Sequence, residues 1–365
     1  MDQAEMDAAL AAHERFLRGS GGTRIILRFV EATGLDCRRR LLNDADFTGA
    51  HLEGSQFAGS HLERASFYCA DLRGCDLRSS NLRRSDLRGA SLAGAALNGA
   101  MLDAADMRAA CIVEADSKGG FRTLPRPGTN GVVQDGLGAD FTNCAMRGVR
   151  LRDANLKGAN FSGAILDGAD LTGAKLIGAL FHGAVLTSVA MSDLALSAEQ
   201  LGSCVLDPGP EAVARAVRLR AMIEQAGEWV ETGGKCGAAA VLDNEDLRPL
   251  RGAFRGRVLS ALSARAVCAI GVDFSGCELQ GANFDGADLR GASFDSADVR
   301  GATFRDAQLS HAQFRGADLS ALVLPDGAAR LPNFTGAALD RTDFSLTVLE
   351  HPGPARTLAL AGDAA

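Results

Sequence analysis

The chain has 365 residues, a formal net charge of −7 and a sequence pI of about 5.5. This acidic balance argues against direct nucleic-acid binding, because neutralising phosphate groups requires a basic surface. A hydrophobic fraction of 47% excludes wholesale disorder. The chain has 43 glycines but only one tryptophan and one tyrosine. These proportions predict a narrow, regular core built from small residues.

The first residues, MDQAEMDAALAAHERF, are acidic and do not match a secretory signal, which has a basic segment followed by an apolar one. No apolar run approaches the roughly 20 residues of a membrane span. The nine cysteines show no C-x-x-C spacing, which favours reduced thiols used as small apolar residues. We therefore expect a cytoplasmic protein without a membrane span.

The first predicted element is a helix near the N-terminus, with residues at helical spacing at Met6, Leu10, His13 and Leu17. It ends at the pair Gly21-Gly22, which is typical of a helix C-terminus. A five-residue repeat follows. From Leu42 to Ile112 a large apolar residue stands at every fifth position, and a small residue precedes nearly every one by two positions.

The same period restarts at Phe141 and runs to Met191. A third block runs from Phe274 to Leu324, and after one missed repeat the register resumes from Phe334 to Leu349. A period of five matches neither the 3.6 of a helix nor the 2 of a strand. It fits a square coil of four pentapeptides, in which residue i stacks on residue i+20 and the large and small residues point inward.

Several stretches carry the motif most clearly: Ala70-Asp71-Leu72-Arg73-Gly74, Ala154-Asn155-Leu156-Lys157-Gly158 and Ala287-Asp288-Leu289-Arg290-Gly291. They resemble the pentapeptide repeat family, whose consensus is A-(D/N)-L-x-x. The resemblance covers well over half of the chain. It implies an all-β fold, a right-handed quadrilateral parallel β-helix. The functions of the family are diverse.

A second helix is predicted over residues 210–232 from the stripe Ala212, Ala216, Leu219, Ile223, Ala226 and Val230. Three pairs of positions share one offset in numbering, 212, namely Gly21 and Gly233, Leu35 and Leu247, and Leu42 and Phe254. We interpret this offset as an internal duplication. It predicts two tandem modules, 1–204 and 205–356, each a β-helix with an N-terminal helical cap, and a disordered tail at 357–365.

Between residues 254 and 270 the repeat is weak, because Ala264 and Ala269 stand at positions for large residues. A short helix over residues 258–270 is the alternative there. Residues 113–138 interrupt the first module with prolines, glycines and basic residues. A loop of this length is either a tolerated insertion or a functional element. In the second case its candidate partner contacts are Lys118, Phe121, Arg122 and Arg126.

In the second module Glu278, Asp298 and Asp318 follow one another at the i+20 spacing and are expected to stack on one face. An acidic column of this kind is one requirement of a DNA-mimicking surface, and these three residues are further candidate contacts. Neighbouring columns mix signs, since Asp285 and Arg305 are related by the same spacing. The series Arg73, Arg78, Arg83 and Arg88 has a period of five, so it forms a ring around one coil and not a patch.

No zinc-site, nucleotide-binding or hydrolase motif occurs in the sequence. We therefore predict a non-enzymatic scaffold for a protein partner, without cofactor or metal. The first alternative, which the topoisomerase-directed branch of the family suggests, is a DNA mimic that modulates a type II topoisomerase, DNA gyrase. The second is a carbohydrate-active enzyme, because polysaccharide lyases are also β-helices, although with longer coils and wider bores.

Overall fold

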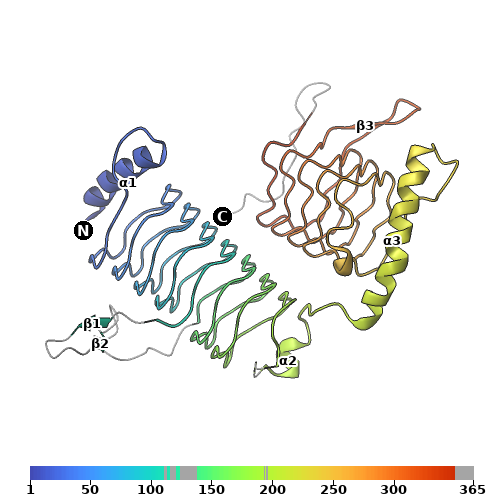
Figure 1. The fold of residues 1–365 in the computed structure, drawn as a ribbon. Coiled ribbons are helices and arrows are strands. Elements are labelled where there is room, and N and C mark those ends of the chain that lie inside the picture. The colour runs from blue at the N-terminus through green and yellow to red at the C-terminus, as the bar shows by residue number, and fades with distance from the viewer. Residues whose placement is uncertain (111–112, 116–120, 124–137, 193, 195, 350–365) are drawn as a thin grey trace. The chain divides into compact units, whose positions relative to one another are not determined.

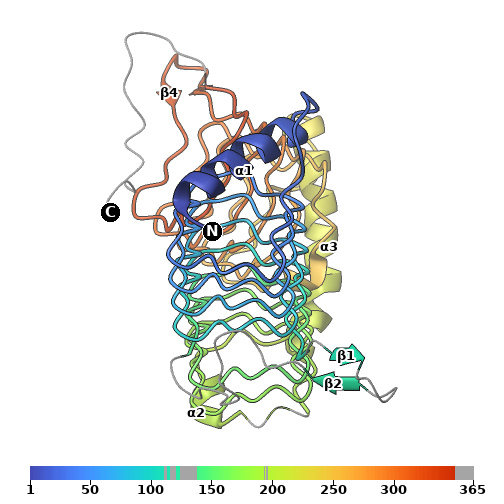
Figure 2. The same ribbon diagram turned by 90° about the vertical axis from the view of Figure 1, so that its left-hand side faces the viewer.

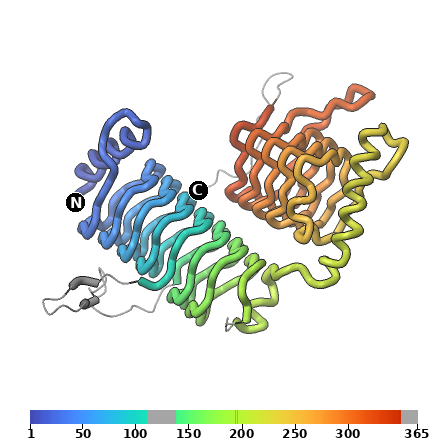
Figure 3. The backbone as a smooth tube through the Cα atoms, in the orientation of Figure 1, coloured from blue at the N-terminus to red at the C-terminus, as the bar shows by residue number. Residues whose placement is uncertain are grey.

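A computed structural model of the chain describes residues 1–110, 113–115, 121–123, 138–192, 194 and 196–349. The chain divides into two compact units, Met1–Asp207 and Pro208–Ala365. In each unit a helix precedes a stack of square coils (Figures 1 and 3). The elements are α1 (Gln3–Leu17), β1 (Val113–Ala115), β2 (Phe121–Thr123), α2 (Ala198–Leu201), α3 (Pro210–Glu231), the 3-10 helix η1 (Arg248–Leu250), β3 (Leu322–Val323) and β4 (Ala329–Arg330). None of the described helices is long and apolar enough to cross a membrane.

The coils repeat at the i+20 spacing, as the period of five predicts. Each regular pentapeptide makes a parallel bridge to the pentapeptide one coil further along, for example Asp46 to Ser66. The backbone N–H of Leu42 likewise donates to the carbonyl oxygen of His61 in the next coil, at 2.7 Å. Each coil therefore pairs with the next on its four sides, and backbone hydrogen bonds run along the length of the stack.

Tight turns form the corners of each coil. At one corner the N–H of Ala50 donates to the carbonyl of Phe47 at 3.0 Å, and Gly49 between them has φ +65°. A positive φ at the third position is typical of a type II turn and is accessible to glycine without a steric penalty. The glycine that often stands two positions after the large residue therefore suits the backbone of the corner.

The bore of each unit is filled by the large and small residues of the repeat. In the second unit the rings of Phe274, Phe294 and Phe314 stack in a column with centroids 5.0 and 4.7 Å apart. Phe284 and Phe304 belong to a second column, and their rings lie 5.3 Å apart. Rings of the two columns meet edge to face, which is a favoured geometry for aromatic pairs.

The first unit begins its coils at Ile25, earlier than the repeat at Leu42 indicates. In this first coil the sizes are exchanged: Ala32 and Cys37 occupy positions for large residues, while Ile25 and Leu35 occupy positions for small ones. All four are buried. A close-packed core requires each layer to be filled, and the exchange keeps the layer filled.

The second unit shows the same exchange, and its coils continue through residues 254–270. Ala264 is completely buried, and Leu262 fills the small position beside it. The alternative of a short helix at 258–270 is therefore wrong. Leu247 occupies a large position and its counterpart in the offset of 212, Leu35, a small one. This pair is not structurally equivalent, so the three sequence pairs do not share one structural offset.

Both stacks are interrupted at a corner. In the first unit Ala96 pairs with Asp140, at i+44 instead of i+20, and the excursion between them includes the antiparallel pair β1–β2. In the second unit Thr303 pairs with Asn333, at i+30, and the excursion carries the antiparallel pair β3–β4. The prediction that Leu324 fills the bore is therefore wrong, because it lies in the turn of this hairpin.

Helices pack on the first coil of each stack. In the first unit Met6, Leu10 and His13 of α1 are completely buried, and Figure 2 shows α1 lying across the end of its coils. In the second unit Leu219 and Ile223 of α3 join the core of that unit. Helix α1 begins at a capping box in which Asp2 accepts from the N–H of Glu5. The tail predicted at 357–365 lies outside the described residues.

Candidate interaction surfaces

The acidic residues Glu278, Asp298 and Asp318 lie in consecutive coils of the second unit, joined by parallel bridges. Glu278 is exposed, and the other two are partly buried. The structure thus brings these three candidate residues together on one face. The strength of the field that they project depends on the cations around them.

Arg300 neutralises much of this column. Its Nε donates to Oδ1 of Asp298 at 2.9 Å and its Nη2 to Oδ2 at 2.6 Å, while its Nε lies 3.6 Å from a carboxylate oxygen of Asp318. Gln280 Nε2 also donates to Asp298 at 2.6 Å. Burial raises the pKa of Asp298, but the hydrogen bonds from Arg300 and Gln280 outweigh burial and hold that pKa below its ordinary value.

The same clamp recurs throughout both units. An aspartate directly before the large residue accepts two hydrogen bonds from the arginine directly after it, as a bidentate guanidinium–carboxylate pair. The pairs are Asp36–Arg38, Asp71–Arg73, Asp76–Arg78, Asp86–Arg88, Asp106–Arg108, Asp246–Arg248, Asp288–Arg290 and Asp298–Arg300. The remaining arginine of the ring, Arg83, pairs with Asp103 at 3.1 Å. The charges of the motif therefore serve largely to pair with one another.

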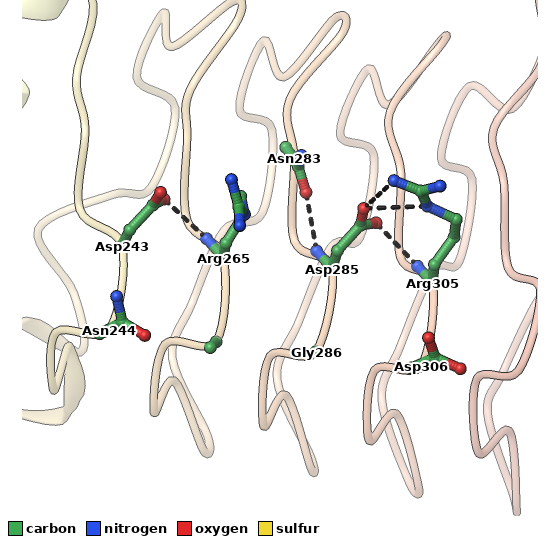
Figure 4. Close-up of a pocket in the computed structure, with 9 residues that line it drawn as sticks. Asp243, Asn244, Arg265, Asn283, Asp285, Gly286, Arg305 and Asp306 are labelled. Carbon is green, nitrogen blue, oxygen red and sulfur yellow. Dashed lines mark hydrogen bonds and ion pairs between the residues drawn. The ribbon is translucent and has the colours of Figure 1, made fainter.

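A groove of about 520 Å³ runs along one corner of the second unit. Figure 4 shows one wall, in which Asp243, Arg265, Asp285 and Arg305 alternate in sign along consecutive coils. Asp285 accepts two hydrogen bonds from the guanidinium of Arg305, at 2.9 and 2.6 Å. Small-molecule sites are mostly apolar and enclosed. This groove is polar and mixed in charge, so it is better suited to contact with another polar macromolecular surface.

The hairpin β3–β4 is held on the side of the second unit. Leu322 packs over Gly281 and Gly301, and a Cβ on Gly301 would lie 2.9 Å from the Cβ of Leu322. The next residue, Val323, is 68% exposed, and Leu331 beyond β4 is 65% exposed. The base of the hairpin is therefore fixed on the coils, and two apolar side chains near it are exposed. The five-residue period of the sequence does not reveal the hairpin, because Leu324 falls on a position for a large residue.

The loop that the sequence singled out is described in part. Phe121 and Arg122 belong to β2, where they pair with Ala115 and Glu114 of β1. Lys118 and Arg126 lie outside the described residues. An antiparallel pair of strands therefore stands within the interruption of the first unit, and two of its four candidate contact residues are on one strand.

The buried thiols are unreactive. Cys75 and Cys277 occupy positions for small residues, and their Sγ atoms donate to the carbonyls of Leu52 and Phe254 at 3.0 and 2.8 Å. Burial raises the pKa of Cys75 to about 12 and that of Cys277 to about 11. A thiol with so high a pKa is a poor nucleophile at neutral pH. In the described part of the chain, no group of three or more His, Cys, Asp or Glu residues could hold a metal ion.

These features define a square β-helix of pentapeptides with projecting hairpins. The sequence model of the family of pentapeptide repeats matches this chain in eight copies. The matched residues are 41–78, 80–116, 138–173, 164–197, 270–306 and 296–320, together just over half of the chain. The chain therefore belongs to the pentapeptide repeat family. The family implies a right-handed β-helix, and its members are generally non-enzymatic structural or interaction proteins.

Solved structures similar to this chain include three other pentapeptide repeat proteins. QnrB1, a plasmid-mediated fluoroquinolone resistance protein, is 20% identical over 54% of this chain and 97% of its own, with a TM-score of 0.29. HetL, involved in heterocyst differentiation regulation in the cyanobacterium Nostoc, is 18% identical over 92% and 94%, with a TM-score of 0.14. A protein from the Arabidopsis thaliana thylakoid lumen is 23% identical over 41% and 70%, with a TM-score of 0.23. No curated protein sequence matches.

Proposed function

We propose that this protein is a non-enzymatic scaffold that binds a protein partner through elements projecting from its coils. The observation that carries the proposal is the hairpin β3–β4, whose base is fixed by Leu322 over Gly301 while Val323 and Leu331 are exposed. Most charged residues on the coils form ion pairs with one another. The segments that leave the repeat therefore offer the more distinctive contacts. The loop at 113–138, with Lys118, Phe121, Arg122 and Arg126, is the second proposed contact.

We further propose that α1 and α3 act as caps and that the two units arose by internal duplication. An uncovered first coil would expose a β edge and an open apolar bore, which invites aggregation. The buried residues of α1 and α3 support this role. The buried thiols in the bore are compatible with a reducing compartment, and we propose the bacterial cytoplasm. The acidic net charge favours a protein partner over nucleic acid.

Affinity capture with quantitative mass spectrometry tests the proposal. The variant Val323→Asp with Leu331→Asp should lose a protein that the wild type enriches, because two charges would be placed in an apolar contact. The matched control is Val213→Asp with Val217→Asp, which adds two charges at residues of α3 that are 55% and 78% exposed. A variant lacking residues 113–138 tests the second contact. Identical capture by all of these proteins would refute the proposed contact surfaces.

DNA mimicry is the alternative proposal, and Glu278, Asp298 and Asp318 would be its central residues. Their stacking in one column supports it. The clamp of Arg300 on Asp298 counts against it, because a DNA mimic needs a one-sided negative field. A gyrase supercoiling assay, with and without a quinolone, decides the question. No effect at micromolar protein would eliminate this alternative.

A further inference from the structure

The groove of the second unit carries a row of charges that alternates in sign from coil to coil. The row consists of Asp243, Arg265, Asp285 and Arg305, one residue on each of four consecutive coils (Figure 4). Each aspartate accepts a hydrogen bond at 3.0 Å from the backbone N–H of the arginine that follows it in the row. The N–H of Ala266 also donates to the carbonyl of Asp285 at 2.9 Å. The row therefore stands on a hydrogen-bonded backbone that fixes its spacing at about 4.8 Å per coil.

Arg265 is the unpaired cation of this row. It is exposed, and in the part of the chain that the structure describes its guanidinium forms neither a hydrogen bond nor an ion pair. Arg305 is also exposed, but its guanidinium donates twice to Asp285. A free guanidinium is a strong donor to a carboxylate. Arg265 is therefore available to a carboxylate from another molecule.

The row of charges is complementary to itself when it is read in the opposite direction. A reversed copy places Arg305 opposite Asp243 and Asp285 opposite Arg265, so that all four contacts join opposite charges. A copy that runs in the same direction places like charges opposite each other. A partner surface of one sign meets two attractive and two repulsive charges. The order of the charges thus favours an antiparallel copy of the same row.

The spacing of the row favours the same partner. Residues on one face of an extended strand are roughly 6.6 Å apart, twice the rise per residue. Successive turns of a helix are about 5.4 Å apart. Neither matches a row with one charge every 4.8 Å or so. Another stack of coils has this spacing, and a second copy of this chain has both the spacing and the order of charges.

The neighbouring residues of the corner form a second row that agrees with this arrangement. The row consists of Asn244, Ala266, Gly286 and Asp306, all exposed. In the antiparallel arrangement Ala266 lies opposite Gly286, where a Cβ would meet nothing within 4 Å, so the centre of the contact is free of bulky groups. At its two ends Asn244 lies opposite Asp306, and an amide can donate to a carboxylate.

We propose that two copies of this chain associate antiparallel through this groove, about a two-fold axis between the coils of Arg265 and Asp285. The guanidinium of Arg265 then binds the carboxylate of Asp285 in the second copy, and the symmetric pair forms on the other side of the axis. The contact spans only four coils, so we expect a weak dimer with a Kd of roughly 10–100 µM. Val323 and Leu331 do not line this groove, so this proposal and the proposed binding of a protein partner fail or stand separately.

Sedimentation equilibrium of the full chain at increasing protein concentration tests the proposal. The mass of the wild type should rise from 37.9 kDa toward twice that value, and added salt should shift it back toward the monomer. Arg265→Glu should weaken association by about tenfold or more, because it places a glutamate opposite Asp285 at two symmetric positions. The matched control is Arg220→Glu, the same charge change at an exposed residue of α3 outside the groove. It should associate as the wild type does.

Exchanging the charges between two copies gives a sharper test. Asp285→Arg alone should also fail to associate, because it places an arginine opposite Arg265. A mixture of Arg265→Glu with Asp285→Arg should form a mixed dimer, because both symmetric positions then join opposite charges. Asp285 also holds Arg305 in its own chain, so the fluorescence of Trp229 must show that this variant folds. If it does not fold, the comparison of Arg265→Glu with the control decides the question.

Three results would overturn the proposal. The first is a wild type that stays monomeric at concentrations well above the expected Kd. The second is a dimer that Arg265→Glu leaves intact, or that the control weakens equally. The third is a mixture of the two folded variants that does not associate. A wild-type dimer that only the groove variants dissociate, and that their mixture restores, supports the proposal.

Discussion

The bore of the first unit is filled mainly by leucine between two groups of phenylalanine, whereas in the second unit phenylalanine stands at every second large position from Phe274 to Phe344, and Phe254 packs against Phe274. The first unit accepts a long excursion within its leucine section, and the second accepts a shorter one near its end. Each coil of a solenoid contacts only its neighbours. Continuity of the bore, and not continuity of the chain, therefore holds such a stack together.

Removing a ring from the continuous column should have the largest effect. Phe294 contacts four other rings, with centroid distances from 4.7 to 5.6 Å. Phe294→Ala should lower the unfolding free energy of the second unit by about 3–5 kcal/mol, through lost burial and the cavity left behind. Denaturant unfolding monitored by the fluorescence of Trp229, the only tryptophan, reports on the second unit.

The matched substitution in the first unit is Phe161→Ala, whose ring stacks on Phe141 and Phe181 at 5.0 and 5.1 Å. It should destabilise the first unit and leave the Trp229 transition in place. A shift of that transition by Phe161→Ala would show that the two units unfold as one, and the contrast between separate stacks would then fail.

A smaller effect is expected where helix α1 meets its first coil. Gly22 has φ +94°, and a Cβ there would collide with the carbonyl oxygen of Ala12. Gly21 has φ +85°, but a Cβ there would meet nothing within 4 Å. Gly21→Ala should therefore cost only backbone strain, about 1 kcal/mol, and Gly22→Ala about 2–3 kcal/mol. Calorimetry of the two variants measures the difference, and equal costs would contradict the steric argument.

The second unit has its own version of this contact, at Gly237. This residue has φ +75°, and a Cβ would collide with the carbonyl oxygen of Gln225 in α3. In the sequence the pair Gly233-Gly234, which comes shortly after α3, is the more visible signal of a helix end. The residue that must be glycine is the one closest to the helix backbone, and that proximity is a tertiary property.

The five-residue period was sufficient to predict the coil and the stacking at i+20. The period missed the coil at 25–41, because the small Cys37 stands there at a position for a large residue and Leu35 at a position for a small one. A search for large residues at every fifth position does not recognise a layer that is filled in this way. It missed the hairpin at 321–332 for an arithmetical reason. The insertion equals two whole repeats, so Phe334 keeps the register of Leu319 although the chain has left the coil between them.

The charged surface was predictable only in part. The column of Glu278, Asp298 and Asp318 follows from the i+20 stacking, and the structure places it as that stacking requires. The ion pair between Arg300 and Asp298 did not follow from the i+20 stacking, because these residues are two apart in the sequence, on either side of an inward-pointing side chain. Only the pleat of the coil brings the positions before and after Val299 to the same outer side.

A pH effect should distinguish the two units. His13 of α1 is completely buried, with Nδ1 accepting from the N–H of Ile25 at 3.1 Å and Nε2 donating to the carbonyl of Asn43 at 3.0 Å. Burial lowers the pKa of His13 below its ordinary value of 6.5. The neutral imidazole is therefore the form that stabilises the fold. Its contribution is complete above pH 6.5 and is lost as the pH falls from that value through the lower pKa of the folded state.

The charged groups near this imidazole are Arg24, Asp44 and Glu14. Protonation leaves the buried N–H of Ile25 without its acceptor, a cost of about 1–3 kcal/mol. Calorimetry at about pH 7.5 and about pH 5.5 should show the transition of the first unit falling further than that of the second, because the buried residues of α3 carry no titratable group. His13→Gln should remove the additional fall, and its persistence in that variant would assign the effect to other groups.

The smallest effect on stability is expected from the acidic column itself. Arg300 is 36% exposed, so Arg300→Ala should cost at most about 1 kcal/mol, as for other surface ion pairs. The pKa of Asp298 should rise toward its ordinary value, because the variant loses the guanidinium hydrogen bonds that lower it. Its depressed pKa stabilises the fold above the ordinary pKa of 3.8, and that contribution is lost as the pH falls through the folded value. NMR titration of the carboxyl group measures the change.

Arg305→Ala, which breaks the pair with Asp285 on another column of the same unit, is the matched control and should leave the pKa of Asp298 unchanged. The same two variants also separate the two functional proposals. If Arg300→Ala inhibits gyrase while the wild type and Arg305→Ala do not, the column has the geometry of a DNA mimic and the clamp suppresses its field. If none of the three inhibits, the column is ordinary solenoid surface, and the contacts of this protein must be sought on its hairpins.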